Sequence, residues 1–407
     1  MNFLIEPKNR LKTLSNVEKK KHLLKRRIVR YLYFHGPKSA AEISKKLKSS
    51  IPTISSIINE LLSLDVIIEQ GQGNSSGGRR PNLYGLQDDV FYILGIDIGW
   101  FTTKIAIFNT KLESVSEFIN HPLLLKDDNR LIHEIYDLAN KLIDKSGIDR
   151  NKLIGVGIDM PGLIDAEKGI NYTYFYDEEN TLAKRFEDLF ELPVFIENDA
   201  NARTLAEYRY GLAKGTKNTL VLHVGWGVGL GMIINKELYR GSSGFAGEFS
   251  HIPLVENGLL CKCGKQGCLE TVASGTALVR LAKEGIHQGK HSTLSEKIEK
   301  GQELIPKTII EAANEGDQFA ISIIAKVGFE LGKGIAALIQ LFNPELIILG
   351  GRVAEANQYL LTPIEQALNH YSIPKLRNQS KIKISKLGTN ANILGAVAMV
   401  SENIFEK

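Results

Sequence analysis

From Phe91 onward, short apolar runs alternate with longer segments of helical periodicity, and this alternation constrains the fold more than any other feature of the chain. Short runs of this kind, bounded by turn residues, are typical of buried strands. They cover residues 92–97, 104–108, 153–158, 194–196, 219–224 and 346–349. Because helical segments separate several of these strands, the sequence predicts an α/β fold, in which the second run forms a hairpin with the first.

The residues before Phe91 show a different order, with helical segments first and two short extended segments after them. Ser39 and Ser50 are predicted N-caps, and Pro52 falls in the first turn of the last helix. The predicted helices cover 17–34, 39–47 and 50–62, and the predicted strands cover 66–69 and 82–84, with a loop at 71–78 between them. This order is typical of a winged helix-turn-helix with its wing and linker, here residues 1–88. A small helical bundle used for dimerisation is the alternative.

The charge of the chain is unevenly distributed. Residues 1–90 contain 16 Lys and Arg against 8 Asp and Glu, whereas the remaining 317 residues contain 34 against 38. A basic head on a mildly acidic body indicates that the head binds a polyanion. With 43% hydrophobic and 24% charged residues, the chain also has enough apolar material for a sizeable core, which excludes a disordered or disulfide-stapled protein.

If the head binds double-stranded DNA, its lysines and arginines would contact phosphates, which set affinity and its salt dependence but do not select a sequence. The predicted phosphate contacts are the basic cluster of the first helix, Lys45, Lys46, Lys48, Arg79 and Arg80. The segment between Ser49 and Ile68 contains no Lys or Arg. Base contacts are therefore assigned to Thr53, Ser55, Ser56 and Asn59, and direct readout is expected to be modest. Arg79 and Arg80 are expected to reach a narrow minor groove.

The cysteines form the sharpest chemical signal. Cys261, Cys263 and Cys268 are the only cysteines in the chain, and glycines between them allow a tight loop. Their odd number excludes a closed disulfide framework, and we interpret them as reduced thiols in a cytoplasmic protein that has no signal core or membrane-spanning run. Three thiolates with His251, ten residues upstream, supply the four corners of a structural zinc site.

Acidic side chains form two further groups. Asn198 and Asp199 follow the predicted strand at 194–196, and ligands of α/β folds bind beyond the carboxyl ends of strands. A carboxylate there accepts a proton from a hydroxyl, and the amide holds a second hydroxyl. Glu248 lies three residues before His251, and Glu270 directly follows the cysteine loop. By itself, each of these groups is a weak signal.

Taken together, these segments resemble the ROK family (repressors, open reading frames and sugar kinases). The matching pieces are Gly95–Gly99, Met160-Pro161-Gly162, Glu197–Ala202, Gly225–Gly229, Ala246-Gly247-Glu248, His251, the cysteine loop ending in Glu270, and Asn343-Pro344 with Gly350-Gly351. The resemblance implies an actin-like, hexokinase-like fold, related to ribonuclease H, with two lobes beside a sugar cleft and assembly as homodimers or homotetramers. The lobes would comprise residues 89–199 with 393–407, and residues 200–392 with the zinc loop and sugar site.

The resemblance also assigns roles to residues. The family's sugar contacts correspond to Gly162, Asn198, Asp199, Glu248, His251 and Glu270. In the kinases of the family, the acid that corresponds to Asp199 is the catalytic base that deprotonates the 6-hydroxyl of the sugar. Ser250 departs from the pattern, because the kinases usually have glycine before the histidine.

The phosphate-binding segments depart further from the kinases. Remnants of these segments are Asp97, Gly99, Gly225, Gly227, Gly350 and Gly351. Family kinases have a second glycine and a hydroxyl residue where this chain has Trp100 and Phe101, and a threonine where it has Trp226. Large aromatic side chains obstruct phosphates and provide no hydroxyl donor, so these substitutions disfavour binding of Mg-ATP.

The sequence therefore predicts a sugar-responsive transcriptional regulator, acting as a repressor, that binds operator DNA and a hexose-type effector. The first alternative is an ATP-dependent sugar kinase, or a dual kinase and regulator, that uses Asp199 as its base. The second is a regulator controlled by capture on another protein, because some relatives are sequestered by a sugar-transport protein.

Overall fold

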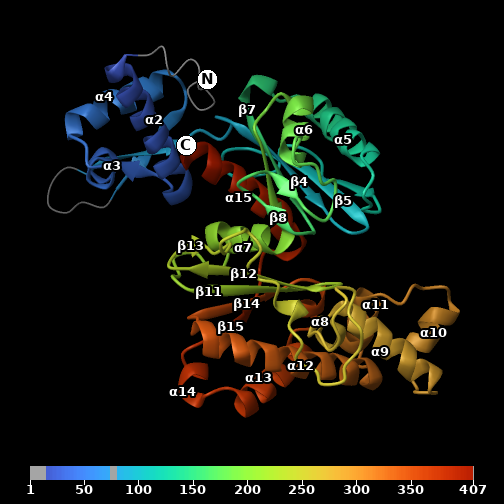
Figure 1. The fold of residues 1–407 in the computed structure, drawn as a ribbon. Helices are drawn as coiled ribbons and strands as arrows, with labels where there is room; N and C mark the ends of the chain where they lie inside the picture. The colour runs from blue at the N-terminus through green and yellow to red at the C-terminus, as the bar shows by residue number, and fades with distance from the viewer. Residues whose placement is uncertain (1–14, 74–79, 407) are drawn as a thin grey trace. The chain divides into compact units, whose positions relative to one another are not determined.

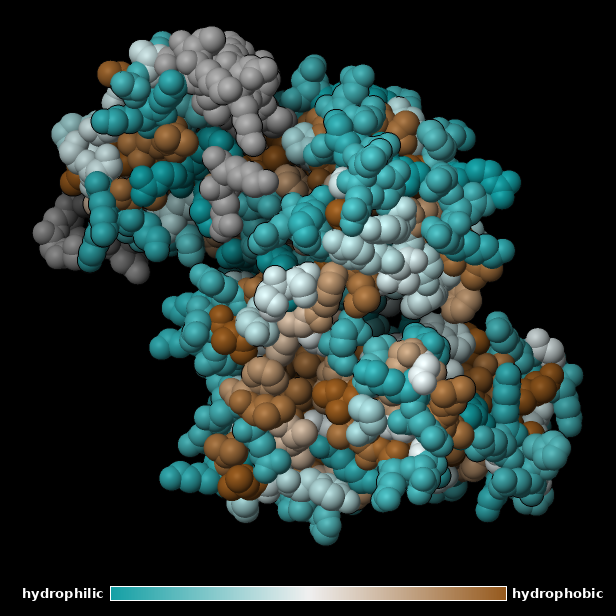
Figure 2. All heavy atoms as spheres, in the orientation of Figure 1, coloured by the Kyte–Doolittle hydropathy of each residue, from teal (hydrophilic) through white to brown (hydrophobic). Residues whose placement is uncertain are grey.

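The structure is a computed structural model that describes residues 15–73 and 80–406. The chain forms two compact units. Unit 1 runs from the N-terminus to Glu197 and also contains the chain from Ala396 onward, and unit 2 comprises Asn198–Gly395 (Figure 1). Figure 2 shows hydrophilic side chains around the outer edge of each unit, with hydrophobic patches between them.

Unit 1 begins with helices and a small antiparallel sheet. The elements are α2 (Asn16–His35), β1 (Lys38–Ser39), α3 (Ala40–Leu47), α4 (Ile51–Ser63), β2 (Ile67–Gln72) and β3 (Asn82–Leu86). Ser39 caps α3 in a capping box with Glu42, and Ser50 caps α4, so both predicted helix starts are confirmed. The sheet has the order β1-β3-β2. Strand β1 was not predicted, because two residues are too few to show a period. Strand β2 continues into the segment predicted as a loop.

The remainder of unit 1 is an α/β sandwich around a five-stranded sheet of order β10-β7-β4-β5-β6. Its strands are β4 (Tyr92–Ile98), β5 (Thr102–Phe108), β6 (Ile119–Pro122), β7 (Leu153–Met160) and β10 (Val194–Asn198), with a small pair formed by β8 (Ile164–Asp165) and β9 (Ile170–Asn171). The predicted hairpin of β4 and β5 is confirmed, and β4 runs parallel to β7. Helices α5 (Arg130–Ser146) and α6 (Leu182–Phe190) bury their apolar faces in the core of this sheet.

The C-terminal helix α15 (Ala391–Glu406) covers the other face, where Gly157 of β7 allows close approach to Ala396. The end of α15 also contacts α2. Ser401 Oγ donates to the Tyr33 hydroxyl at 3.1 Å, and the Arg26 guanidinium donates to the Ile404 carbonyl. Helix α2 therefore packs against the C-terminal helix, a contact that no local sequence pattern predicts.

Unit 2 has a five-stranded sheet of order β13-β12-β11-β14-β15. The strands are β11 (Thr219–Val224), β12 (Val228–Ile234), β13 (Glu237–Leu238), β14 (Leu346–Gly350) and β15 (Lys381–Ile384). Its larger core contains residues of α9 (Gly275–His287), α11 (Pro306–Asn314), α12 (Gln318–Phe342) and α13 (Gln358–Tyr371), and α7 (Asp199–Tyr210) packs on the opposite side of β11 and β12. Shorter elements are η2 (Phe249–His251), α8 (Glu270–Ala273), α10 (Thr293–Glu299) and α14 (Pro374–Arg377).

The predicted α/β architecture is confirmed in both units. In the described part of the chain, no helix combines the length and the apolar character that a membrane span requires.

Candidate functional site

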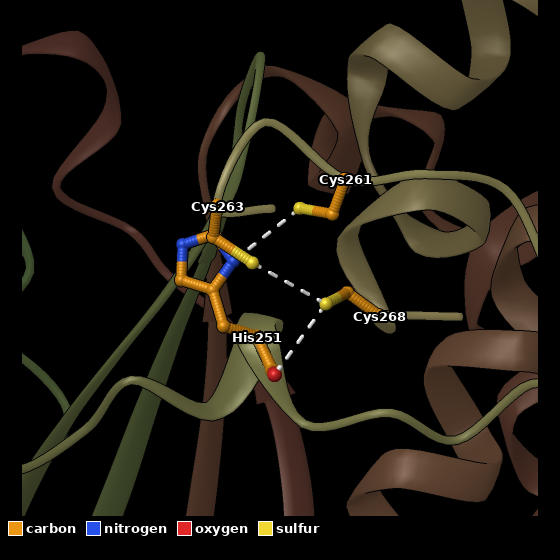
Figure 3. A group of neighbouring side chains, drawn as sticks. All are labelled: His251, Cys261, Cys263 and Cys268. Atoms are coloured by element: carbon orange, nitrogen blue, oxygen red, sulfur yellow. Dashed lines mark hydrogen bonds between the residues drawn. The ribbon is translucent and has the colours of Figure 1, made fainter. Parts of the chain in front are cut away.

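The four predicted metal ligands lie together in unit 2. One nitrogen of His251 and the sulfur atoms of Cys261, Cys263 and Cys268 all lie within 4.8 Å of one another. The Cys261 Sγ is 3.5 Å from His251 Nδ1, and the Cys263 and Cys268 sulfurs are 3.6 Å apart. Figure 3 shows the three thiols and the imidazole ring converging on one point.

This donor set fits zinc. Tetrahedral zinc with sulfur and nitrogen ligands has bonds of about 2.0–2.3 Å, which places neighbouring ligand atoms roughly 3.3–3.8 Å apart. The Cys261 Sγ–His251 Nδ1 and Cys263 Sγ–Cys268 Sγ separations of 3.5 and 3.6 Å fall in that range. Four protein ligands leave no open position, so the site is suited to a structural ion.

The loop that carries the thiols folds as a short hairpin. The Cys261 N–H donates to the Lys265 carbonyl at 2.8 Å, and Gly264 N–H donates back to the Cys261 carbonyl at 2.9 Å. Gly264 and Gly267 both have positive φ, and a Cβ on Gly267 would collide with the Val255 carbonyl. The glycines are therefore required by the turn that brings the thiols together.

His251 connects the metal ligands to an acidic cluster. Its Nδ1 faces Cys261, while its Nε2 lies 3.8 Å from Glu248 Oε2. The two residues belong to one short turn, because Glu248 directly precedes η2 and His251 ends it. Burial raises the pKa of Glu248, and the Asp199 and Glu270 carboxylates raise it further, against the opposing effect of His251. The structure thus gathers three predicted sugar residues, Asp199, Glu248 and Glu270, within electrostatic reach.

Asp199 and Glu270 each begin a helix. Asp199 opens α7, where the Asn198 side chain caps the helix by accepting from Ala200 N–H at 2.9 Å. One turn later, the Arg203 guanidinium lies 3.9 Å from the Asp199 carboxylate. Glu270 opens α8 and lies 3.3 Å from Lys262 Nζ. A Cβ on Gly227 would lie 2.7 Å from Glu270 Oε2, so this carboxylate packs directly on the glycine loop.

The remaining predicted sugar residue, Gly162, belongs to unit 1 and follows β7. Its φ is +120°, and an added Cβ would lie 2.6 Å from the Asn171 side-chain oxygen. Asn171 Nδ2 donates to the Pro161 carbonyl at 3.1 Å, so the turn is held in place. The role of Gly162 stays a prediction.

The glycine loops of unit 2 contain an unpredicted histidine. His223 is the next-to-last residue of β11, and a Cβ on either Gly225 or Gly351 would lie 2.7 Å from one of its ring nitrogens. The imidazole therefore lies against both loops that would hold phosphates in a kinase. Burial, helped by the Arg203 charge, lowers the pKa of His223 well below its usual value. The sequence feature that could have identified His223 is its position near the end of a buried strand, two residues before Gly225. Trp226, at the tip of this loop, is 37% exposed.

The first phosphate-loop remnant of unit 1 also has a cationic neighbour. Asp97 pairs across the sheet with Lys104 of β5 and with Asp159 of β7. Burial lowers the pKa of Lys104, and both carboxylates counteract this shift. An ammonium group is thus present beside Asp97, next to the turn that carries Trp100 and Phe101.

The predicted DNA-contact residues lie on the N-terminal elements of unit 1. Thr53, Ser56 and Asn59 share an exposed face of α4, whereas Ser55 is half-buried. Lys45, Lys46, Lys48 and Arg80 are exposed, and Arg79 lies outside the described residues.

The basic cluster of the first helix is partly engaged elsewhere. Lys25 forms an ion pair with Glu60 of α4, and Arg26 donates to the Ile404 carbonyl. These two side chains join α2 to neighbouring helices, and their assignment as phosphate contacts stays a prediction.

Comparisons with known proteins place these features in a family. A family model described as "ROK family" matches residues 93–403. The xylose repressor of Caldicellulosiruptor bescii is 34% identical, with 89% of this chain and 91% of the relative covered. The glucokinase of Halalkalibacterium halodurans is 36% identical, with 78% of this chain and 98% of the relative covered.

A solved structure is also similar. It is described as a ROK family transcriptional regulator, homologous to the MLC protein of Escherichia coli, and matches with a TM-score of 0.78 and 27% identity, covering 94% of this chain and 97% of the other. Because the family model spans more than half of the sequence, the chain belongs to the ROK family.

Proposed function

We propose that this protein is a sugar-responsive transcriptional regulator that acts as a repressor. The observation that carries the proposal is the N-terminal segment. The family match begins only at residue 93, and the elements before it, within the described residues 15–73 and 80–92, are three helices with a β1-β3-β2 sheet, the order of a winged helix-turn-helix. The xylose repressor is covered over 91% of its length, whereas the glucokinase match leaves 22% of this chain uncovered.

In this proposal α4 is the recognition helix, and its exposed Thr53, Ser56 and Asn59 contact base edges. Its exposed face has no cation, so affinity depends on lysines and arginines around it, including Lys45, Lys46, Lys48 and the wing residues Arg79 and Arg80. Double-stranded operator DNA is the partner, and assembly as a homodimer or homotetramer stays a prediction.

The effector in this proposal is a sugar that binds the acidic cluster of unit 2. Asp199, Glu248 and Glu270 accept hydrogen bonds from hydroxyl groups, and such charge-assisted bonds are stronger than neutral ones. A zinc ion held by His251, Cys261, Cys263 and Cys268 would hold together the two ends of the segment that runs from Glu248 to Glu270. The His251 ring would then serve two functions, through Nδ1 toward the metal and Nε2 toward the sugar pocket.

Sugar binding changes the affinity for DNA only by the difference between its affinities for the two states of the protein. Couplings of this kind are typically ~1–3 kcal/mol, or about 5–150-fold in affinity.

The second candidate function is an ATP-dependent sugar kinase, which the 36% identical glucokinase favours. Asp199 would be its base, and Mg-ATP its cofactor. Two features oppose it: Trp226 at the tip of one phosphate loop, and the His223 ring against Gly225 and Gly351.

The two functions are separated by measuring sugar-dependent ADP formation with Mg-ATP, D-xylose, D-glucose and N-acetyl-D-glucosamine. We expect no turnover above that of an Asp199→Asn control, with binding of at least one sugar by calorimetry. Turnover that is lost in Asp199→Asn would establish a kinase.

A further inference from the structure

One cysteine of the metal site differs from the other two in its access to solvent. Cys261 and Cys268 are buried, whereas Cys263 is exposed. The susceptibility of a cysteine to oxidation follows its thiolate character and its exposure, and the thiolate is also the form that binds zinc. A small oxidant in solution therefore reaches Cys263 before it reaches either buried cysteine.

The four ligands divide into two close pairs, which Figure 3 shows. Cys263 Sγ lies 3.6 Å from Cys268 Sγ, and Cys261 Sγ lies 3.5 Å from His251 Nδ1. The exposed cysteine thus has a buried cysteine as its neighbour. Because a disulfide bond is about 2.0 Å long, a short movement of these two side chains is enough to join them.

Backbone hydrogen bonds shape the loop between these two cysteines. The Gly267 N–H donates to the Leu259 carbonyl at 2.9 Å, and Leu260 forms an antiparallel bridge with Gln266. These bonds join backbone atoms, so they do not depend on what the sulfurs bind. The turn therefore keeps the two cysteines close together when the sulfurs change partners.

The buried member of the pair lies next to a predicted sugar residue. Glu270 follows Cys268 by two residues, and the Thr271 N–H donates to the Cys268 carbonyl at 3.0 Å. Leu269, between them, donates its N–H to the Ile252 carbonyl at 3.0 Å. A change at the Cys268 sulfur therefore occurs in the same turn of the chain as Glu270.

We propose that the thiol cluster is an oxidation switch, in which hydrogen peroxide joins Cys263 to Cys268 as a disulfide. Cys261 and His251 then remain as two ligands for an ion that takes four, so the site loses its zinc. All four residues belong to unit 2. Because thiols reduce disulfides by exchange, the switch is reversible.

The reaction has two steps. The Cys263 thiolate attacks one peroxide oxygen, the O–O bond breaks, and a sulfenic acid and a hydroxide form. The Cys268 thiolate then attacks the Cys263 sulfur, so that the S–S bond forms, the S–O bond breaks and a second hydroxide leaves. Both hydroxides take protons from solvent and become water. Each sulfur gives up one electron, and the peroxide accepts both.

The consequence for sugar binding rests on the proposed function. In that proposal the metal holds together the ends of the segment from Glu248 to Glu270, so the oxidised protein would bind sugar more weakly. The disulfide and the loss of zinc do not rest on it.

The experiment treats the zinc-loaded full chain with hydrogen peroxide. We expect zinc, measured with a chromogenic chelator, to fall from about one ion per chain to near zero, and free thiols to fall from three to one. Peptide mapping by mass spectrometry should find the disulfide between Cys263 and Cys268. Dithiothreitol with added zinc should restore both values. Calorimetry with D-xylose, D-glucose and N-acetyl-D-glucosamine should show at least tenfold weaker binding after oxidation.

Two matched variants identify the reacting cysteine. Cys263→His and Cys261→His each keep four nitrogen or sulfur ligands, a set that holds structural zinc in other proteins. We expect Cys263→His to release zinc at least tenfold more slowly in peroxide than the unsubstituted protein does. Cys261→His should release it at the unsubstituted rate, because Cys263 and Cys268 remain.

Three results would overturn the inference: zinc and all three thiols persist in peroxide, the mapped disulfide includes Cys261, or Cys263→His releases zinc as fast as the unsubstituted protein. If a variant binds no zinc, the map of the unsubstituted protein decides. If zinc is released but sugar affinity does not change, the switch does not control sugar binding. If neither the reduced nor the oxidised protein binds sugar while the disulfide forms, the proposed function fails and the switch stands.

Discussion

Two regions of unit 2 differ in how fully they keep the features of a sugar kinase. The cluster beside the thiol loop brings Asp199, Glu248 and Glu270, the acids that we propose bind the sugar, within electrostatic reach of one another. The glycine loops keep their backbone glycines, but Trp226 occupies the tip of one loop and His223 packs between Gly225 and Gly351. In our proposal, the chain retains the groups that recognise a sugar and has lost space and donors for phosphates.

This difference predicts that sugar binding and phosphoryl transfer are separable in this protein. Sugar recognition requires fixed carboxylates, whereas phosphoryl transfer requires close backbone approach and a metal near the phosphates.

The largest expected effect comes from removing the metal. Cys268→Ser should reduce zinc from about one ion per chain to near zero and weaken sugar binding by about 100-fold, because the loop positions both Glu248 and Glu270. Metal analysis and calorimetry measure the two effects, with Lys265→Ala on the same loop as control. Full sugar affinity in a zinc-free variant would show that the metal does not support the pocket.

Removing one acid tests the retained region directly. Glu248→Ala or Glu270→Ala should each weaken sugar binding by about 10–100-fold, since charged hydrogen bonds contribute ~1.5–3 kcal/mol, and should abolish the DNA response. Operator affinity measured without sugar should equal that of the unsubstituted protein in both alanine variants and in the exposed control Glu299→Gln. A normal response in either alanine variant would contradict the assigned pocket.

The wing arginines test the N-terminal segment that we propose binds DNA. Arg79→Ala with Arg80→Ala should weaken operator binding about tenfold and reduce the salt slope by roughly 2, because each arginine is assigned one phosphate. Fluorescence anisotropy over a salt series measures both, and Lys290→Ala with Lys300→Ala is the control. An unchanged salt slope would show that the wing arginines do not contact DNA phosphates.

The smallest expected effect concerns His223 in the altered region. Its pKa is lowered in the folded protein, so below about pH 6.5 the unfolded chain binds a proton that the native state does not. Stability is therefore lost as pH falls, by on the order of 1 kcal/mol per pH unit relative to His223→Gln. Urea unfolding at pH 7.5, 6.5 and 5.5 measures the difference. If the free energy of unfolding changes equally with pH in both proteins, the His223 imidazole is not buried against the glycine loops.

Local patterns predicted the elements of this fold well. Ser39 and Ser50 mark the starts of α3 and α4, and strand β11 has the predicted bounds Thr219–Val224. These features depend on neighbouring residues only. The spacing of the three cysteines and His251 also predicted that their donor atoms lie together, because their loop is short.

Contacts between distant segments were not predictable in this way. The pairing of Tyr33 with Ser401 and of Lys25 with Glu60 depends on how helices pack, which no periodicity records. The sequence did not identify His223 as a site residue, because it lies within an apolar strand. Its ring lies against Gly225 and Gly351, which are 2 and 128 residues away along the chain. The two-residue strand β1 is formed by its partner β3 rather than by its own sequence.

The central claim is tested most directly by the effect of sugar on DNA binding. A DNA fragment selected from a random library by the zinc-loaded protein would be titrated by fluorescence anisotropy, with and without each saccharide named above. We predict that at least one saccharide weakens DNA binding by about 5–150-fold, that Glu248→Ala abolishes this change, and that no ADP is formed. Unchanged DNA affinity with every saccharide, together with sugar-dependent ADP formation, would contradict the account and identify a kinase.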